Sequence, residues 1–237
     1  MFIRMLTQAA IFFVLAMMSL GAMTAADIEG TILVKRKLTK RTVTANVTWY
    51  QRGVAVPLTA REDEDALSFE RAHVVLYLEG DLPANAVQAT MDQKNRRFIP
   101  DLLAVPTGST VLFPNGDPIF HNVFSLSRPK AFDLGNYPKG QSRSVTFSKA
   151  GIVFVNCHLH PNMGATIVVS PNQWVTKADA QGRFVLRNVP PGKYTIVAWH
   201  KSAGFFRQII QVDEDHGATV QFLIPFESDG TKAPARS

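Results

Sequence analysis

Short runs of strand-forming residues, rather than helical repeats, dominate this chain and limit the folds that it can adopt. Val, Ile, Phe and Thr recur in brief segments, and Gly, Pro, Asn and Asp separate one segment from the next. Closely spaced strands with such turns indicate an all-β fold built from β-sandwiches. Helical candidates are confined to 64–71 and 82–87, and we expect strands at 28–34, 43–50, 73–79, 103–106, 110–113, 121–125, 143–147, 152–157, 165–169, 183–187, 194–200, 206–212 and 219–224.

Residues 1–26 have the pattern of a secretory signal peptide. Arg4 precedes an apolar run, and small residues then lead to Asp27. Because the apolar run is short for a membrane span, we expect cleavage after Ala25 or Ala26, with an uncleaved anchor as the alternative. The expected location is outside the cytoplasm, in the periplasm if the source has two membranes. We expect the polar residues 227–237 to form a flexible tail.

The formal net charge is +6, and the basic residues are scattered along the chain. A basic surface would steer an acidic redox protein partner or touch an anionic membrane surface. We expect no nucleic-acid binding, because an exported protein meets little nucleic acid and no base-reading motif is present. The sequence leaves the oligomeric state open.

The single cysteine, Cys157, is the most informative compositional feature. Exported proteins usually pair their cysteines, so an unpaired one needs a reason. It is either buried and inert or held as a thiolate by a metal ion.

The spacing around Cys157 favours the metal. Cys157-x2-His160-x2-Met163 lies between two expected strands, and His121 follows the turn at 115–118 on a neighbouring strand. Two imidazoles, one thiolate and a weak thioether are the ligand set of a blue-copper site. We therefore predict one mononuclear copper site, surrounded by apolar side chains that exclude water: Phe113, Phe120, Phe154 and Val155.

The same region resembles the plastocyanin/amicyanin branch of the cupredoxins. The pattern is Phe98-x-Pro100…Val105-x-x-Gly108-x-x-Val111-x-Phe113-x-Asn115-x-Asp117…His121-Asn122-Val123…Gly151…Cys157-x2-His160-x2-Met163. The resemblance implies a Greek-key β-sandwich that binds copper through His121, Cys157, His160 and Met163 and transfers electrons. Asn122 resembles the asparagine that fastens the ligand loop in that family.

A second resemblance covers the C-terminal side of the chain. Asp179-x-x-Gly182-x-Phe184 and Pro190-Pro191-Gly192-x-Tyr194 are similar to turns of the carboxypeptidase regulatory-like domain, a small transthyretin-like sandwich. Strands that precede those turns in that family resemble 28–32 and 73–78. We therefore expect a cupredoxin sandwich at 83–171, inserted in or adjacent to a small sandwich made of 27–82 plus 172–226. The alternative is two or three domains strung in sequence.

The other histidines are not expected to bind metal. His158 is next to Cys157, but strand alternation points it to solvent. His73, His200 and His216 stand alone in the flanking sandwich.

Motifs of hydrolytic and phosphate-binding enzymes are absent from the sequence, and a nucleophilic role for Cys157 would leave Met163 unexplained. The sequence therefore predicts that the chain is not an enzyme. It predicts an electron carrier between redox partners. The alternatives are a copper-delivery protein with the same ligands and a non-redox interaction module.

Overall fold

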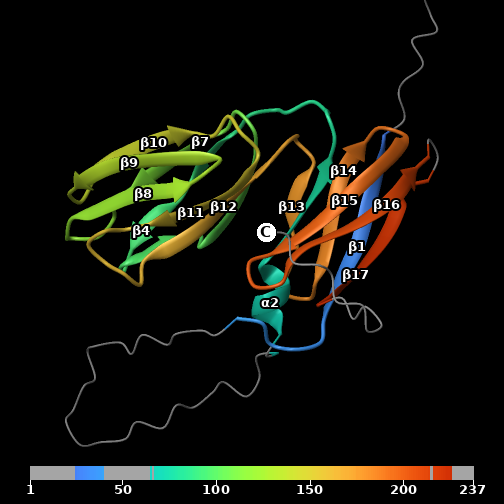
Figure 1. Cartoon of the computed structure of the whole chain (residues 1–237), viewed down its shortest axis with the longest axis horizontal. Coiled ribbons are helices and arrows are strands. Elements are labelled where there is room, and N and C mark those ends of the chain that lie inside the picture. The colour runs from blue at the N-terminus through green and yellow to red at the C-terminus, as the bar shows by residue number, and fades with distance from the viewer. Residues whose placement is uncertain (1–24, 40–64, 66, 214–215, 226–237) are drawn as a thin grey trace, which may run out of the picture.

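A computed structural model describes residues 25–39, 65, 67–213 and 216–225, and this part of the chain is almost entirely β-strand. Its single helix is the short α2 (Ser68–Ala72). The strands form two groups of sheets that lie side by side along the long axis of the molecule (Figure 1). The prediction of an all-β, sandwich-type fold is confirmed.

The first group combines strands from both ends of the described chain. One sheet has the order β14-β1-β17, and the other has the order β13-β2-β15-β16. None of the strands between β2 and β13 takes part in these sheets. The bounds are β1 (Ala26–Val34), β2 (Val74–Glu79), β13 (Val175–Lys177), β14 (Arg183–Val189), β15 (Gly192–His200), β16 (Gly204–Val212) and β17 (Ala218–Ile224).

The second group holds the intervening strands. A three-stranded sheet has the order β10-β7-β3, a five-stranded sheet has the order β6-β12-β11-β8-β9, and β4 and β5 form a hairpin. The bounds are β3 (Gln88–Thr90), β4 (Asp92–Lys94), β5 (Arg97–Ile99), β6 (Leu102–Pro106), β7 (Thr110–Pro114), β8 (His121–Ser127), β9 (Lys130–Tyr137), β10 (Ser142–Thr146), β11 (Gly151–Asn156) and β12 (Gly164–Ser170).

Each group encloses its own apolar core, and a smaller cluster joins the two. In that cluster Val75 of β2 and Trp199 of β15 pack with Leu102 of β6 and Val168 of β12, all of them buried. The five-stranded sheet therefore uses one face for its own core and part of the other face to rest against the flanking sheet.

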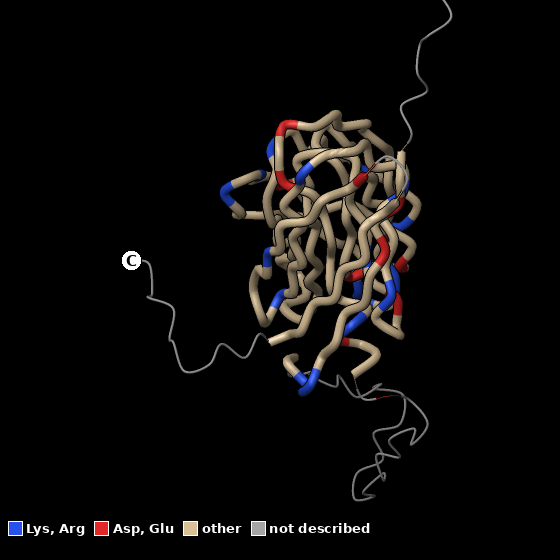
Figure 2. The backbone as a smooth tube through the Cα atoms, turned by 90° about the vertical axis from the view of Figure 1, so that its right-hand side faces the viewer, with Lys and Arg blue, Asp and Glu red and all other residues tan. Residues whose placement is uncertain are grey.

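Polar contacts reinforce the same boundary. His73 Nε2 lies 3.1 Å from Asp101 Oδ1, and Lys177 Nζ donates a hydrogen bond to the carbonyl oxygen of Leu102 at 3.1 Å. In the side view of Figure 2, Lys and Arg are interspersed with Asp and Glu along the chain, so neither sign of charge gathers on that side.

Every strand predicted within the described residues is present, with ends shifted by a residue or two. Five strands are new: β3, β4, β5, β9 and β13. The expected helix at 82–87 is wrong, because these residues have no regular secondary structure and lead from β2 to β3. Pro83, which opens this segment, favours an extended residue before it. The helix candidate at 64–71 corresponds to α2.

Several predictions fall outside the described residues: the strand at 43–50, the tail at 227–237 and the signal peptide up to residue 24. Within the described residues, no helix has the length and apolar character needed to cross a bilayer. The domain boundaries and the likeness to the carboxypeptidase regulatory-like domain stay predictions.

Gly30 provides a test of the paired ends of the chain. A Cβ at this position would collide with the carbonyl oxygen of Val220 and the ring of Phe184 on the two flanking strands. We expect Gly30→Ala to lower the free energy of unfolding by about 1–3 kcal/mol, the usual cost of overpacking. Urea denaturation would measure it. Gly164→Ala is the control, because its Cβ would meet only ordinary contacts, with Asn156 Oδ1 at 3.5 Å and the carbonyl oxygen of Val155 at 3.7 Å. Equal stability of the two variants would contradict the close packing of β1.

Candidate metal centre

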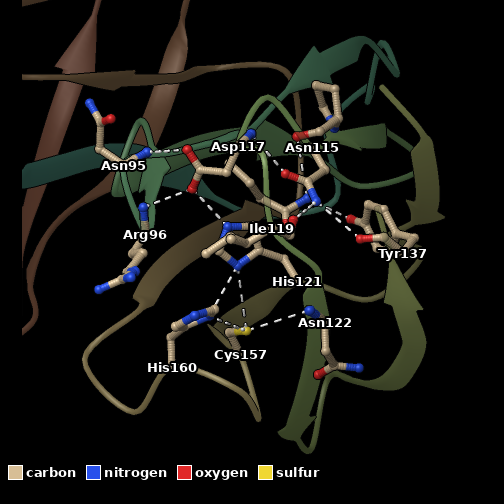
Figure 3. A network of polar contacts seen from close by, with 12 residues as sticks. Asn95, Arg96, Asn115, Asp117, Ile119, His121, Asn122, Tyr137, Cys157 and His160 are labelled. Carbon is tan, nitrogen blue, oxygen red and sulfur yellow. Dashed lines mark hydrogen bonds and ion pairs between the residues drawn. The ribbon is translucent and has the colours of Figure 1, made fainter. Parts of the chain in front are cut away.

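Three side chains that are predicted metal ligands meet at one end of the five-stranded sheet (Figure 3). His121 Nδ1 and His160 Nδ1 are 3.1 Å apart. Cys157 Sγ lies 3.6 Å from His160 Nδ1 and 4.0 Å from His121 Nδ1. Two imidazole nitrogens and one sulfur therefore face a common point, although up to 39 residues separate them in sequence.

The loop after β11 brings Cys157 and His160 together by its own hydrogen bonds. The N–H of Met163 donates to the carbonyl oxygen of His160 at 2.9 Å, and the N–H of Cys157 donates to the carbonyl oxygen of Met163 at 3.2 Å. These bonds turn the chain back within a few residues before β12 begins. The x2 spacing thus corresponds to a tight turn that directs both side chains inward.

His121 enters the site from the start of β8, where its side chain is fully buried. Its Nε2 is 2.7 Å from Asp117 Oδ2, so the ring presents its other nitrogen, Nδ1, to Cys157. Burial raises the pKa of Asp117, but hydrogen bonds from the backbone of Arg96, from His121 and from the backbone of Asn95 outweigh it and leave that pKa below its usual value. The carboxylate is therefore ionised at neutral pH.

Cys157 is almost fully buried, and the backbone N–H of Asn122 donates to its Sγ at 3.4 Å. The Asn122 side chain links three segments, because its Nδ2 donates to Asp133 Oδ1 at 2.7 Å and its Oδ1 accepts from the N–H of His158 at 3.4 Å. Asn122 therefore contacts the ligand loop, as its resemblance to the family's asparagine implies.

Met163 is buried in the same apolar cluster as Cys157. Its backbone closes the ligand loop, as described above. Its role as the axial thioether ligand stays a prediction.

Two of the four predicted water-excluding residues are placed as expected. Phe113 and Val155 are fully buried in the core next to the site. Phe120 and Phe154 are 56% and 43% exposed, so their assignment was wrong. Alternation along β11 explains Phe154, because Val153 and Val155 point into the core and the residue between them must point out.

The remaining histidines lie away from the three-residue cluster. His158 is exposed, as expected, and stacks on Phe124 with ring centroids 3.6 Å apart. His73 pairs with Asp101, and the buried His200 Nε2 lies 3.1 Å from Glu70 Oε2 without a well-formed hydrogen bond to it.

The separations within the cluster fit a single metal ion. Bonds of about 2.0–2.3 Å from a first-row metal to nitrogen and sulfur would hold trigonal ligand atoms about 3.5–3.8 Å apart. Of the observed separations, 3.6 Å lies within this range, 3.1 Å lies below it and 4.0 Å lies above it. The pKa of His160 is lowered by burial, by neighbouring His121 and by the charge of Arg96, so its imidazole is neutral and able to bind a metal at neutral pH.

No protein-family model and no curated protein matches the chain. Similar solved structures include the purple cupredoxin from Nitrosopumilus maritimus, at 25% identity and a TM-score of 0.32, over 36% of this chain and 100% of that one. A mutant of amicyanin in its reduced state is similar at 26% identity and a TM-score of 0.32, over 40% of this chain and 97% of that one. These TM-scores are too low to establish a function. The evidence for a function therefore comes from the side chains of the site.

The prediction that the chain is not an enzyme is contradicted. The copper-containing nitrite reductase from Thermus scotoductus is similar at 27% identity and a TM-score of 0.33, over 37% of this chain and 22% of that one. The chain thus spans about a fifth of that protein. The missing enzyme motifs on which the prediction depended do not exclude catalysis, because a bound metal can itself be the catalytic group.

The lowered pKa of His160 has a measurable consequence in the copper-free protein. Since the folded state binds this proton less readily than the unfolded state, folding stability should fall as the pH drops below 6.5, the ordinary value. An NMR titration should find the pKa of His160 below 6.5. Arg96→Ala should raise that pKa by removing a nearby positive charge, and Arg183→Ala, on the flanking sandwich, should leave it unchanged. An unchanged His160 pKa in the first variant would show that Arg96 does not act on this ring.

Proposed function

We propose that this chain is a copper-binding electron-transfer protein. The observation that supports it best is the meeting of Cys157 Sγ with the Nδ1 atoms of His121 and His160 around one point. A thiolate with two imidazoles is the donor set of blue copper, and a buried Met163 near the loop offers the weak fourth donor. Copper bound there would supply a one-electron change between Cu(II) and Cu(I).

The surrounding residues would keep electron transfer fast by fixing the positions of the ligand side chains. His121 and Cys157 are buried, and each has a further contact that fixes it, from Asp117 and from the backbone N–H of Asn122. Because these side chains are already ordered, little would need to rearrange when the charge changes. The same burial disfavours rapid metal exchange, which a copper-delivery protein needs.

His160 would be the exit for the electron. It is the least buried of the three residues in the cluster. The charge of Arg96, on the turn between β4 and β5, acts on its ring, and the same hairpin carries two further exposed basic residues, Lys94 and Arg97. The proposed partner is therefore an acidic redox protein that docks at this end of the sandwich.

We also propose that the chain is exported, through the signal peptide at 1–26, and that it is periplasmic if the source has two membranes. The pairing of β1 and β2 with strands after residue 174 supports one small sandwich from 27–82 plus 172–226, with 83–171 inserted in it. In this proposal the flanking sandwich has the carboxypeptidase regulatory-like fold and positions the copper site against its partner.

The visible spectrum tests the copper site directly. Wild-type protein from Asp27 onward, loaded with Cu(II), should show an intense thiolate-to-copper band, and Cys157→Ser should lack it because a hydroxyl cannot replace the thiolate. His158→Asn is the control, since His158 is exposed and outside the cluster, and it should keep the band. A colourless wild type would overturn the proposal. A blue protein that cannot be reoxidised after reduction and that loses its copper to a chelator would favour the alternative function, copper delivery.

Met163 can be tested by the reduction potential. Met163→Leu should keep the visible band, because Cys157 and both imidazoles remain, and it should raise the potential, because losing a donor weakens Cu(II) binding more than Cu(I) binding. Met91→Leu is a matched control, since Met91 is equally buried in the same core but is not a predicted ligand. Equal potentials in the two variants would remove Met163 from the ligand set.

A further inference from the structure

The carboxylate of Asp117 touches both the metal cluster and a neighbouring turn. We infer that Asp117 is a positioning residue that fixes the tautomer of His121 and locks this ring onto the hairpin of β4 and β5. The predicted effect on copper affinity rests on the proposed function, and the tautomer of His121 does not. Its evidence is a set of short contacts around one buried side chain (Figure 3).

The first contact determines which ring nitrogen of His121 is free. A carboxylate can only accept hydrogen bonds, so at 2.7 Å from Asp117 Oδ2 the Nε2 of His121 must carry the proton. A neutral imidazole has one N–H, and Nδ1 is then left with a lone pair. That lone pair points at Cys157 and His160, where a metal ligand is required. Both partners are almost fully buried, so water does not compete for this bond.

The other contacts of the same carboxylate hold a turn that is costly to form. Asn95 N donates to Oδ1 at 2.6 Å and Arg96 N donates to Oδ2 at 2.8 Å. Both residues have φ of 56°, in the left-handed region that side chains rarely adopt. Asp117 Oδ2 thus accepts from His121 and from this turn at once, and links a predicted metal ligand to the β4–β5 hairpin.

Asp117 cannot easily turn away, because its own loop is fixed. Its backbone N–H donates to Asn115 Oδ1 at 2.9 Å. Asn115 Nδ2 in turn donates to the carbonyl oxygens of Ile119 and Tyr137 at 2.9 and 3.0 Å. The stretch from 115 to 121 is therefore built around one asparagine and one aspartate, with His121 at its end.

Asp117→Asn makes this arrangement testable with little change in shape. The amide oxygen, in the place of Oδ1, can still accept from Asn95 N. The NH2 group, in the place of Oδ2, loses the bond from Arg96 N, faces His121 Nε2 and favours a proton on Nδ1 of that ring instead. That proton would stand where the metal must bind. We expect about a 10- to 100-fold loss of copper affinity, the usual effect of removing a partner that orients a metal ligand.

The experiment has two readouts on the full mature chain. Imidazole ¹⁵N shifts of the copper-free protein report the tautomer of His121, and a chelator competition reports Cu(II) affinity. Wild type should carry the proton on Nε2, and Asp117→Asn should shift it toward Nδ1. Glu70→Gln is the matched control. Glu70 is also buried, accepts hydrogen bonds from two backbone N–H groups and faces His200, so this variant should change neither readout.

Each outcome separates this inference from the proposed function. A blue wild type with unchanged tautomer and affinity in Asp117→Asn would overturn the inference alone. A second outcome is a colourless wild type whose His121 carries its proton on Nε2, together with a shift of that proton to Nδ1 in Asp117→Asn. This outcome would overturn the copper function and keep the role of Asp117. Should the variant fail to fold, a wild-type His121 with its proton on Nδ1 would by itself overturn the inference.

Discussion

The buried end of β11 is the constraint on which the proposed site depends. Strand alternation carries Val153, Val155 and then Cys157 into the core, so the thiol is shielded from solvent before any metal is considered. An exposed thiol would be open to oxidation. Burial removes that hazard and places the sulfur beside two imidazoles. The ligand loop only has to turn back once to bring His160 to the same point.

Much of this could be predicted from the sequence, because the relevant signals are local. The spacing from Cys157 to His160 fits one turn, and the β-branched runs mark most of the strands. The missed strands are short or polar: β9 (Lys130–Tyr137) has Gly135 in it and is half-exposed, so no apolar run announces it. Phe154 was misplaced because apolar character alone does not tell which face of a strand a residue takes.

Sequence reasoning also missed contacts between residues that lie far apart in the chain. Asp117 belongs to the quoted motif, but its contacts join a turn at Asn95 and Arg96 to His121, and no spacing rule connects these segments. The Asp117-x3-His121 spacing next to a turn was the one sequence signal for a contact between this carboxylate and the ring of His121. Only the fold shows that the carboxylate points at the ring and not at solvent.

A comparison of two buried histidines shows why one is proposed as a ligand and the other is not. His121 and His200 each face a carboxylate through Nε2, from Asp117 and Glu70. In His200 the other nitrogen, Nδ1, accepts a hydrogen bond from the N–H of Ser202 at 3.2 Å, so the backbone already uses its lone pair. In His121 the Nδ1 atom faces a second imidazole and a thiol. Burial and a carboxylate partner are thus shared by a structural and a functional histidine. What distinguishes them is whether the remaining lone pair is directed at other metal-binding atoms.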